Sequence, residues 1–179
     1  MGDHILLVTD GESDQGEDPV AAAGRIRSLG ISVSAVGIRG EAGTALRELR
    51  AIARAGGGFW DLAEGRRLGR CLRRTLDKAA PGRRAVRLAL VLDRSVSMHR
   101  RLDPAVAGIG ELVPTLLEQR PGSRVALVVF PAAEGPGELL SYFTASAARV
   151  TAALETLRAQ GATPTGPALG LAAALFGAG

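Results

Sequence analysis

Apolar runs of strand length alternate with amphipathic helical patterns along this chain. The runs predict six strands, at residues 4–9, 31–38, 58–62, 86–92, 124–130 and 138–143. Apolar residues that recur every three to four positions predict helices at about 19–29, 44–55, 65–79, 103–119, 146–159 and 166–176. This alternation is typical of an α/β fold in which helices cover both faces of a mostly parallel sheet.

The short turn at 131–137, with the sequence PAAEGPG, sets the direction of the last strand. It is too short for a helical crossover, so the last two strands are predicted to form an antiparallel hairpin at one edge. Right-handed crossovers then favour a three-layer, doubly wound, Rossmann-like sheet of about six strands. The predicted order across the sheet is 58–62, 31–38, 4–9, 86–92, 124–130 and 138–143. The third and fourth of these strands meet at the centre, and ligands bind beyond their carboxyl ends.

Short oxygen side chains gather at this predicted crevice. Asp10 follows the first strand along the chain. Asp93, Ser95 and Ser97 follow the fourth at alternate positions, so an extended loop would turn them to one side. A loop bounded by glycine and proline adds Thr163 just before the last helix. Two carboxylates with hydroxyls make a hard, all-oxygen donor set, which suits Mg²⁺ or Mn²⁺.

Each of these residues also has an ordinary structural interpretation. A lone aspartate such as Asp10 most often belongs to a turn or a helix cap, and serines after a strand commonly cap the next helix. Thr165, in the same loop as Thr163, is suited to cap the last helix. The coincidence of all three segments at one end of the sheet is what favours a ligand site.

Composition argues against a nucleic acid as the partner. The chain has a net charge of +4, but nearly all its basic residues are arginines and no aromatic residues interleave with a basic run. Arginines and apolar residues alternate at helical spacing in one segment, so we interpret these arginines as the solvated face of a helix. They are Arg66, Arg67, Arg70, Arg73 and Arg74.

Length and cysteine content suggest the setting of the protein. A chain of 179 residues is most simply one domain with a sizeable core. No apolar run approaches the roughly 20 residues of a membrane span, and no basic-then-apolar signal opens the chain, so no membrane partner is expected. Cys71, the one cysteine, excludes an internal disulfide framework and favours the cytoplasm.

Other chemistries fit the sequence less well. No strand is followed by a GxGxxG or GxxxxGK[ST] phosphate loop. The acidic stretch after the first strand resembles an EF-hand loop, but Gln15 and Ala21 stand where glycine and glutamate are needed. Neither His4 nor His99 can be placed in an acyl-transfer triad, and His99 is expected at the surface.

Three segments resemble the von Willebrand factor A domain family. They are LVLDRSVSM at 90–98 for its DxSxS motif, GATPTGPAL at 161–169 for its threonine loop, and LLVTDGE at 6–12 for its TDG-type aspartate. DxSxS alone is a weak signal, but the three segments in one predicted sheet are a strong one. The resemblance covers nearly the whole chain and implies the family's metal-ion-dependent adhesion site (MIDAS).

The order of these segments departs from that of the family. In the family the DxSxS motif comes first, then the threonine, then the aspartate, whereas this chain begins with the aspartate half. It looks like a circularly permuted A domain, in which residues 1–79 match the family's C-terminal half, 86–179 match its N-terminal half, and 80–85 link the two. Such a permutation implies that Gly179 lies close to Met1 in space.

Carried over residue by residue, the resemblance implies direct metal ligation by Ser95, Ser97 and Thr163. Asp93 and Asp10 would act largely through bound water. A partner protein would complete the octahedron with a Glu or Asp side chain, so the domain is expected to bind rather than to catalyse. Bacterial intracellular members of the family often work beside MoxR-type AAA+ ATPases or in metal-chelatase complexes, and kinship implies a partner of this kind.

The residues beside the predicted ligands suggest what surrounds the metal. Val96 stands where the family usually has glycine between the two serines. With Thr9, Gly11 and Met98, it is expected to form a shallow, uncharged rim around the ion. The two aspartates, uncompensated at close range, would repel each other until the metal binds.

Two other functions stay open on the sequence. A Mg²⁺-dependent hydrolase could use the same oxygen cluster, although no general base or phosphate cradle is evident. Alternatively, the chain joins halves of two neighbouring domains and completes itself by swapping with a second copy, which would give a dimer rather than the expected monomer. Turnover of phosphate esters distinguishes the first of these functions, and the mass in solution distinguishes the second.

Overall fold

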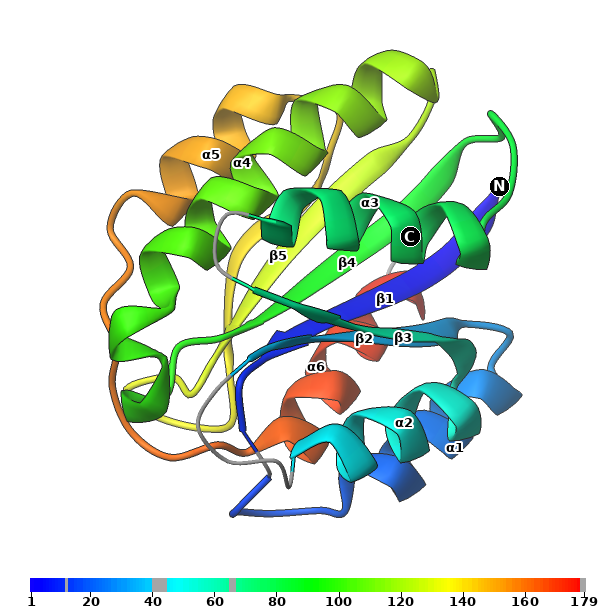
Figure 1. Ribbon diagram of the computed structural model, residues 1–179. Coiled ribbons are helices and arrows are strands. Elements are labelled where there is room, and N and C mark those ends of the chain that lie inside the picture. Colours follow the sequence, from blue (N-terminus) through cyan, green and yellow to red (C-terminus); the bar gives the residue numbers. More distant parts are fainter. Residues whose placement is uncertain (12, 40–44, 65–66, 178–179) are drawn as a thin grey trace.

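The computed structural model describes residues 1–11, 13–39, 45–64 and 67–177 of the chain (Figure 1). Its strands are β1 (Gly2–Thr9), β2 (Ser32–Ile38), β3 (Gly57–Ala63), β4 (Val86–Asp93), β5 (Arg124–Phe130) and β6 (Glu138–Thr144). Its α-helices are α1 (Pro19–Ser28), α2 (Ala45–Ala55), α3 (Leu68–Ala79), α4 (Leu102–Gln119), α5 (Ala147–Leu154) and α6 (Thr165–Gly177). A 3₁₀ helix, η2, spans Val96–Arg100.

The six strands form one sheet in the order β3-β2-β1-β4-β5-β6. Neighbouring strands are parallel except β5 and β6, which pair antiparallel at one edge. The predicted strand order and the predicted hairpin are therefore confirmed. Figure 1 shows helices on both faces of the sheet, which is the three-layer arrangement expected from the alternation of strands and helices.

Alternating side chains of the central strands supply a core to each face of the sheet. On β1, Leu6 and Val8 join the core under α3, α4 and α5, whereas Ile5 and Leu7 join the core under α1, α2 and α6. All four side chains are fully buried. Because burial of one such side chain contributes about 1.5–3 kcal/mol, a slip of one residue along the strand would be strongly unfavourable.

The register of β1 against β4 determines where the candidate site forms. Val8 pairs with Leu92, so the residues that follow them, Thr9 and Asp93, reach the same edge of the sheet together. The parallel strands all end at this edge, which we call the carboxyl edge. The opposite edge, where they begin, is the amino edge.

Two segments differ from the sequence expectation. α5 ends at Leu154 rather than near residue 159. The chain must leave the helix there to run beside the end of β4, where the Gln160 N–H donates to the Arg94 carbonyl at 2.7 Å. After β4, the chain turns into η2 at Val96 instead of staying extended. Single 3₁₀ turns of this kind have little periodicity by which a sequence could reveal them.

The two ends of the described chain meet at the amino edge. On β4, the Arg87 Nε donates to Asp3 Oδ1 at 2.8 Å, and its Nη1 donates to the Phe176 carbonyl at 3.3 Å. One guanidinium thus bridges the start of β1 and the end of α6, which Figure 1 also places at the same end of the sheet. The predicted neighbour of Met1, Gly179, lies outside the described residues.

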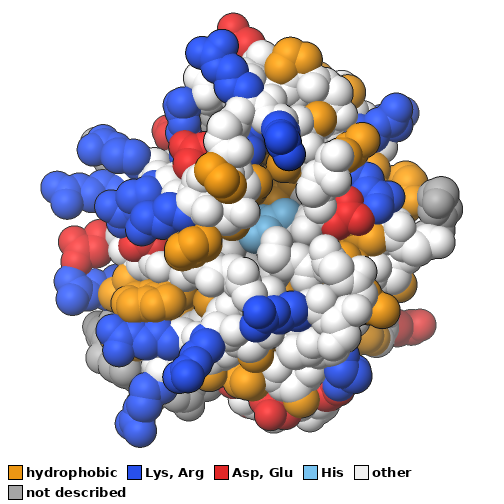
Figure 2. All heavy atoms as spheres, turned by 90° about the vertical axis from the view of Figure 1, so that its right-hand side faces the viewer, with side chains coloured by type: hydrophobic (Ala, Val, Ile, Leu, Met, Phe, Trp, Pro, Cys, Tyr) orange, Lys and Arg blue, Asp and Glu red, His pale blue; other side chains and the backbone are white. Residues whose placement is uncertain are grey.

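Figure 2 views the molecule from the amino edge, and basic side chains gather on the left part of that view. Acidic and apolar side chains lie between them. For the described residues on this face, the basic groups therefore do not form the continuous stripe that follows a nucleic-acid backbone. Within the described part of the chain, no helix is both long and apolar enough to cross a membrane.

Candidate metal site

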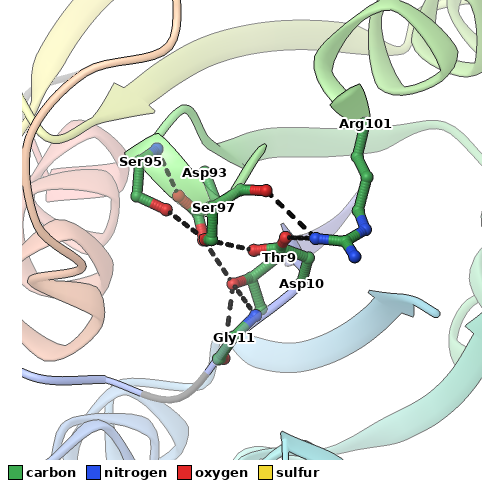
Figure 3. Close-up of polar contacts among 7 residues, drawn as sticks. All are labelled: Thr9, Asp10, Gly11, Asp93, Ser95, Ser97 and Arg101. Atoms are coloured by element: carbon green, nitrogen blue, oxygen red, sulfur yellow. Dashed lines mark hydrogen bonds and ion pairs between the residues drawn. The ribbon is translucent and has the colours of Figure 1, made fainter. Parts of the chain in front are cut away.

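The ends of β1 and β4 hold a connected set of polar side chains at the carboxyl edge (Figure 3). The Thr9 hydroxyl, at the end of β1, donates to Asp93 Oδ2 at 2.5 Å. The Ser95 N–H donates to the other oxygen, Asp93 Oδ1, at 2.7 Å. Both carboxylate oxygens of Asp93 are therefore fixed by donors from the two strand ends.

Burial makes the Asp93 carboxyl unusual. The residue is fully buried, and this burial raises the pKa of Asp93 from 3.8 to about 6. The nearby charge of Asp10 acts in the same direction, whereas the hydrogen bonds from Thr9 and Ser95 oppose it. Without a cation beside it, the ionised form of Asp93 is thus disfavoured, which is the electrostatic setting of a cation site.

Two serine hydroxyls connect Asp93 to Asp10. The Oγ atoms of Ser95 and Ser97 lie 3.0 Å apart, and the Ser97 hydroxyl donates to Asp10 Oδ1 at 2.7 Å. The structure therefore brings together four of the five predicted ligands through a chain of direct contacts. The loop is not extended as expected, because η2 begins between the serines, yet its turn still places both hydroxyls on one side.

Arg101 changes the charge of the crevice. Its guanidinium forms a close ion pair with Asp10 Oδ2, and the same Nη1 donates to the Ser97 carbonyl at 3.0 Å. The Asp10 side chain is only 1% exposed, so this pair is shielded from water on the carboxylate side. The expectation of two uncompensated carboxylates is wrong, because one of them already has a cationic partner.

The expected rim of uncharged residues is also wrong in part. Two of the expected rim residues, Met98 on η2 and Thr9 at the end of β1, are buried, whereas Val96 is 64% exposed. Arg101, which begins the turn into α4, stands at the crevice instead. The rim therefore includes one exposed apolar side chain and one guanidinium, since the turn of η2 directs Met98 into the core.

Thr163, the fifth predicted ligand, lies on a loop held against the other two segments. Its N–H donates to Asp14 Oδ1 at 2.7 Å, and the Val96 N–H donates to the Gly161 carbonyl at 3.1 Å. Thr163 is buried, but within the described residues no hydrogen bond joins its hydroxyl to the serines or to Asp10. The structure thus places the loop beside the crevice without giving this hydroxyl a partner in it.

The ordinary interpretation of Thr165 does not hold. This residue is the first of α6, and its hydroxyl is buried with no hydrogen-bond partner in the described structure, so it does not cap the helix. His99 lies exposed on η2, as expected from the sequence.

The arrangement fits a hard divalent cation. Oxygens that neighbour each other around Mg²⁺, bound at about 2.0–2.1 Å, lie about 3 Å apart, and the two serine oxygens already have this spacing. Two carboxylates against one guanidinium leave the crevice with a net negative charge. Among the described residues, no group of three or more His, Cys, Asp or Glu could hold a metal, so a cation here depends on hydroxyl donors.

Two contributing residues, Asp14 and Arg101, were not predicted as part of the site. Thr9 is expected only at the rim, but the register that pairs Val8 with Leu92 also indicates that Thr9 lies beside Asp93, where its hydroxyl donates to the carboxylate. Asp14 and Arg101 act across turns whose shape the sequence does not reveal. Their long-range contacts, to Thr163 and to Asp10, offer no periodic signal along the chain.

Comparison with known families adds to this geometry. A model of the von Willebrand factor type A domain matches residues 88–179, just over half of the chain, and a second model with the same description matches residues 2–62. The chain belongs to the von Willebrand factor type A (vWA) domain family. The match at 88–179 includes the serines and Asp93, and the match at 2–62 includes Asp10.

This vWA domain is similar over nearly its whole length to two uncharacterized bacterial proteins. One is a protein from Alicyclobacillus acidocaldarius, whose crystal structure matches with a TM-score of 0.82 and 28% identity over 98% of this chain and 93% of that chain. The other is YabS of Bacillus subtilis (strain 168), 26% identical over 92% of this chain and 85% of that protein.

A looser match is to proximal thread matrix protein 1 from the mussel byssus with a zinc-occupied MIDAS motif. It has a TM-score of 0.36 and 20% identity, and covers 90% of this chain and 43% of the mussel chain. A score this low does not establish a common fold.

Proposed function

We propose that this vWA domain is a protein-binding module that uses a divalent ion to hold an acidic side chain of its partner. The observation that carries the proposal is the row of oxygens from Asp93 through Ser95 and Ser97 to Asp10 at the carboxyl edge. Ligands of open α/β sheets bind outside this edge, at the point where the strand order reverses. Here that point lies between β1 and β4.

Each residue has a distinct part in the proposed site. The hydroxyls of Ser95, Ser97 and Thr163 would be direct ligands of Mg²⁺ or Mn²⁺, and Asp93 and Asp10 would hold its water ligands. Bound in this way, the ion supplies an electrophilic position for a carboxylate of the partner. Thr9 keeps Asp93 oriented, and the donors of the η2 turn keep the serines together.

We also infer that the chain is a circularly permuted vWA domain. The DxSxS segment follows the aspartate segment along the chain, yet both reach one crevice. Arg87 bridges Asp3 and Phe176, so a short connection could join the two ends without disturbing the sheet. One chain can supply all six strands, so the sheet is complete without a second copy, and we propose a monomer rather than a domain-swapped dimer.

The proposed role is non-catalytic. A MoxR-type AAA+ ATPase or metal-chelatase system in the cytoplasm is the kind of partner that the family suggests, and the partner's contact residue would be Glu or Asp. Neither a membrane nor a nucleic acid is part of the proposal.

Isothermal titration of the chelator-treated protein with Mg²⁺ and with Mn²⁺ tests the metal step directly. We expect saturable binding of one ion, abolished by Ser97→Ala because one direct ligand is lost. Ser28→Ala, which removes an exposed hydroxyl at the end of α1, serves as the matched control and should bind as the wild type does. Equal metal binding by Ser97→Ala and Ser28→Ala would reject the site.

Capture of partners from lysate, with and without chelator, tests the second step. The bound protein should be released by chelator and should not be retained by Ser97→Ala. Replacement of one acidic residue of that partner should then abolish binding. Retention in excess chelator would refute the metal bridge, and steady turnover of phosphate esters that depends on Ser97 would favour the hydrolase instead.

A further inference from the structure

A second hollow opens on the carboxyl edge, away from the serines. This cavity of about 410 Å³ lies where the end of β3 meets the start of α3. Its lining residues are Arg39, Leu62, Glu64, Arg67, Arg70, Cys71 and Arg74. The volume is within the range of small-molecule pockets. Because β2 and β3 lie one and two strands beyond β1, the cavity is about 10 Å from the metal crevice across the sheet.

The cavity has more positive charge than its own carboxylates neutralise. Arg39 forms a close ion pair with Glu64, and the Arg74 Nε donates to Asp61 Oδ2 at 2.8 Å. The side chains of the other two arginines form no hydrogen bond or ion pair with any described residue. They are Arg67, at the N-cap of α3, and Arg70, in its first turn, three positions apart and therefore neighbours on the helix surface.

The start of α3 adds to this imbalance. Arg67 occupies the N-cap position without making a side-chain capping hydrogen bond, and the first turn contains no acidic residue. A helix N-terminus carries a partial positive charge, so acidic residues stabilise it and basic residues destabilise it. Placing two guanidiniums here costs stability. The Glu111 carboxylate of α4 lies close to Gly69 in this turn, but within the described residues it forms no ion pair with Arg67 or Arg70.

We propose that this cavity binds a phosphoryl group. Four guanidiniums against the carboxylates of Asp61 and Glu64 leave an excess of two positive charges. A phosphate group carries about −1.5 to −2 at pH 7, which matches this excess, whereas a single carboxylate would neutralise only half of it. Arg67 and Arg70 would donate to its oxygens in the forked geometry that guanidinium offers to phosphate.

The phosphoryl group that binds in the cavity could belong to free inorganic phosphate or to a phosphorylated side chain of a protein. This site shares no residue with the metal crevice, and its properties do not depend on the proposed function. All measurements are therefore made in the presence of chelator, so that failure of either proposal leaves the other unaffected.

The first experiment is a calorimetric titration of the full chain with inorganic phosphate, at constant ionic strength set with chloride. We expect saturable binding of one ion. The double substitution Arg67→Gln with Arg70→Gln should weaken it at least tenfold. Arg73→Gln removes an arginine of the same helix that lies outside the cavity and donates to Gln119, and it should change the affinity less than twofold.

Equal weakening by the Arg73 and the double substitutions would show general charge screening and overturn the proposal, as would the absence of saturable binding to the wild type. Cys71 provides a second measurement that does not depend on these variants. Its thiol lines the cavity and is 8% exposed, and burial raises its pKa, so alkylation is followed at mildly alkaline pH. Phosphate should slow this alkylation at least threefold, and an unchanged rate would overturn the proposal.

A phosphoserine peptide, its serine counterpart and its aspartate counterpart identify the source of the group. Tighter binding of the phosphoserine peptide than of free phosphate assigns the site to a phosphorylated protein, and equal binding assigns it to the free ion. Both results support a phosphoryl site. Binding of the aspartate peptide as tightly as the phosphoserine peptide would overturn it.

Discussion

At the scale of single residues, the crevice contains a cation of its own. The Arg101 guanidinium forms an ion pair with Asp10 Oδ2, and the Ser97 hydroxyl donates a hydrogen bond to Asp10 Oδ1. A divalent ion near Asp10 must therefore compete with a guanidinium that is held in place by the Ser97 carbonyl. Arg101 lowers the negative charge offered to the metal, and once displaced it would be free to meet an acidic partner at the rim.

Removing this competing charge should strengthen metal binding. We expect Arg101→Gln to lower the dissociation constant for Mg²⁺ by roughly threefold to tenfold, because one partly buried ion pair no longer has to be broken. Calorimetric titration measures the change. Arg100→Gln, which removes an exposed neighbouring charge, is the control and should have a smaller effect. Weaker binding in Arg101→Gln would mean that the guanidinium orients Asp10 for the metal.

The ionised carboxylate of Asp93 should lower the folding stability of the metal-free protein, although it is needed for metal binding. Its pKa of about 6, against 3.8 when unfolded, means that folding favours the protonated form. The ionised form above pH 6 therefore costs folding stability, by about 3 kcal/mol, and this cost is relieved as the pH falls from about 6 to about 4. In chelator at pH 7.5, Asp93→Asn should raise the unfolding free energy by roughly 1–3 kcal/mol. It should also abolish stabilisation by Mg²⁺.

Urea unfolding across this pH range, with wild type and variant compared at each pH, measures the effect of Asp93. The comparison is needed because the titration of His4 changes the unfolding free energy with pH in the opposite direction. Burial, aided by the charge of Arg120, lowers the pKa of His4 from 6.5 to about 4, so its contribution to stability is lost as the pH falls through that interval. A lower unfolding free energy for Asp93→Asn at pH 7.5 would contradict the expected cost of the carboxylate.

The sequence could identify those site residues whose positions depend on strand ends. Asp10 and Asp93 follow strands with fixed register, so the order of the strands was enough to place them together. The Arg101 contact could not be foreseen, since it depends on how far a long side chain reaches around the η2 turn. The direction of the Thr163 hydroxyl depends on similar details of its loop.

At the scale of elements, the start of α6 packs unusually closely on the loop before α1. A Cβ atom added at Gly166 would lie 2.0 Å from the Glu17 carbonyl oxygen, whereas one added at Gly170, a turn further on, would meet nothing within 4 Å. Backbone cannot move aside as the end of a flexible side chain can. Only glycine therefore allows α6 to begin this close to the loop that carries Asp14.

Two alanine substitutions in the same helix should consequently have opposite effects. Gly166→Ala should lower the unfolding free energy by about 1–3 kcal/mol through overpacking. Gly170→Ala should raise it by roughly 0.5–1 kcal/mol, because alanine loses less conformational entropy in a helix. Thermal and urea unfolding measure both changes. If Gly170→Ala lowered the unfolding free energy as much as Gly166→Ala does, the effect would not come from close packing at Gly166, and the prediction would be wrong.

The spacing of apolar residues predicts the strands and helices, but not every residue at which they begin or end. The apolar runs identified the four inner strands because parallel strands buried on both faces contain few polar residues. The edge strands β3 and β6 are partly exposed and were indicated by shorter runs. The end of α5 was placed about one turn too late, since the residues after Leu154 remain compatible with a helix. Beyond this end the chain is held by a contact far away in the sequence, from the Gln160 N–H to the Arg94 carbonyl.

At the scale of the whole molecule, the chain ends and the crevice lie at opposite edges of one sheet. This arrangement follows from the strand order, which the sequence could predict. Right-handed crossovers and a hairpin at one edge leave few possible orders for six strands. The arginine cavity was not predictable in the same way. The arginines of α3 were interpreted as a solvated face, and the cavity requires Arg39, contributed from the end of β2.

A rearranged gene provides a test of the permutation. The ends are joined by a short Gly-Ser linker, and the chain is opened within residues 80–85, which lie largely exposed. We expect a folded monomer by light scattering that keeps the Mg²⁺ response, because the new order would match that of the family. Opening the chain instead at Arg94, which is buried, should prevent folding. Failure of both rearranged chains to fold would contradict the permutation.

The Arg87 bridge has a practical consequence for measuring partners. From Asp3 in that bridge, β1 runs about 20 Å to Thr9 at the crevice. A tag fused at either end therefore attaches on the far side of the molecule from Asp10. Immobilised through such a tag on a sensor chip, the molecules would all present the crevice to the flowing solution. Binding curves recorded on that surface would report one orientation, free of the spread that random coupling introduces.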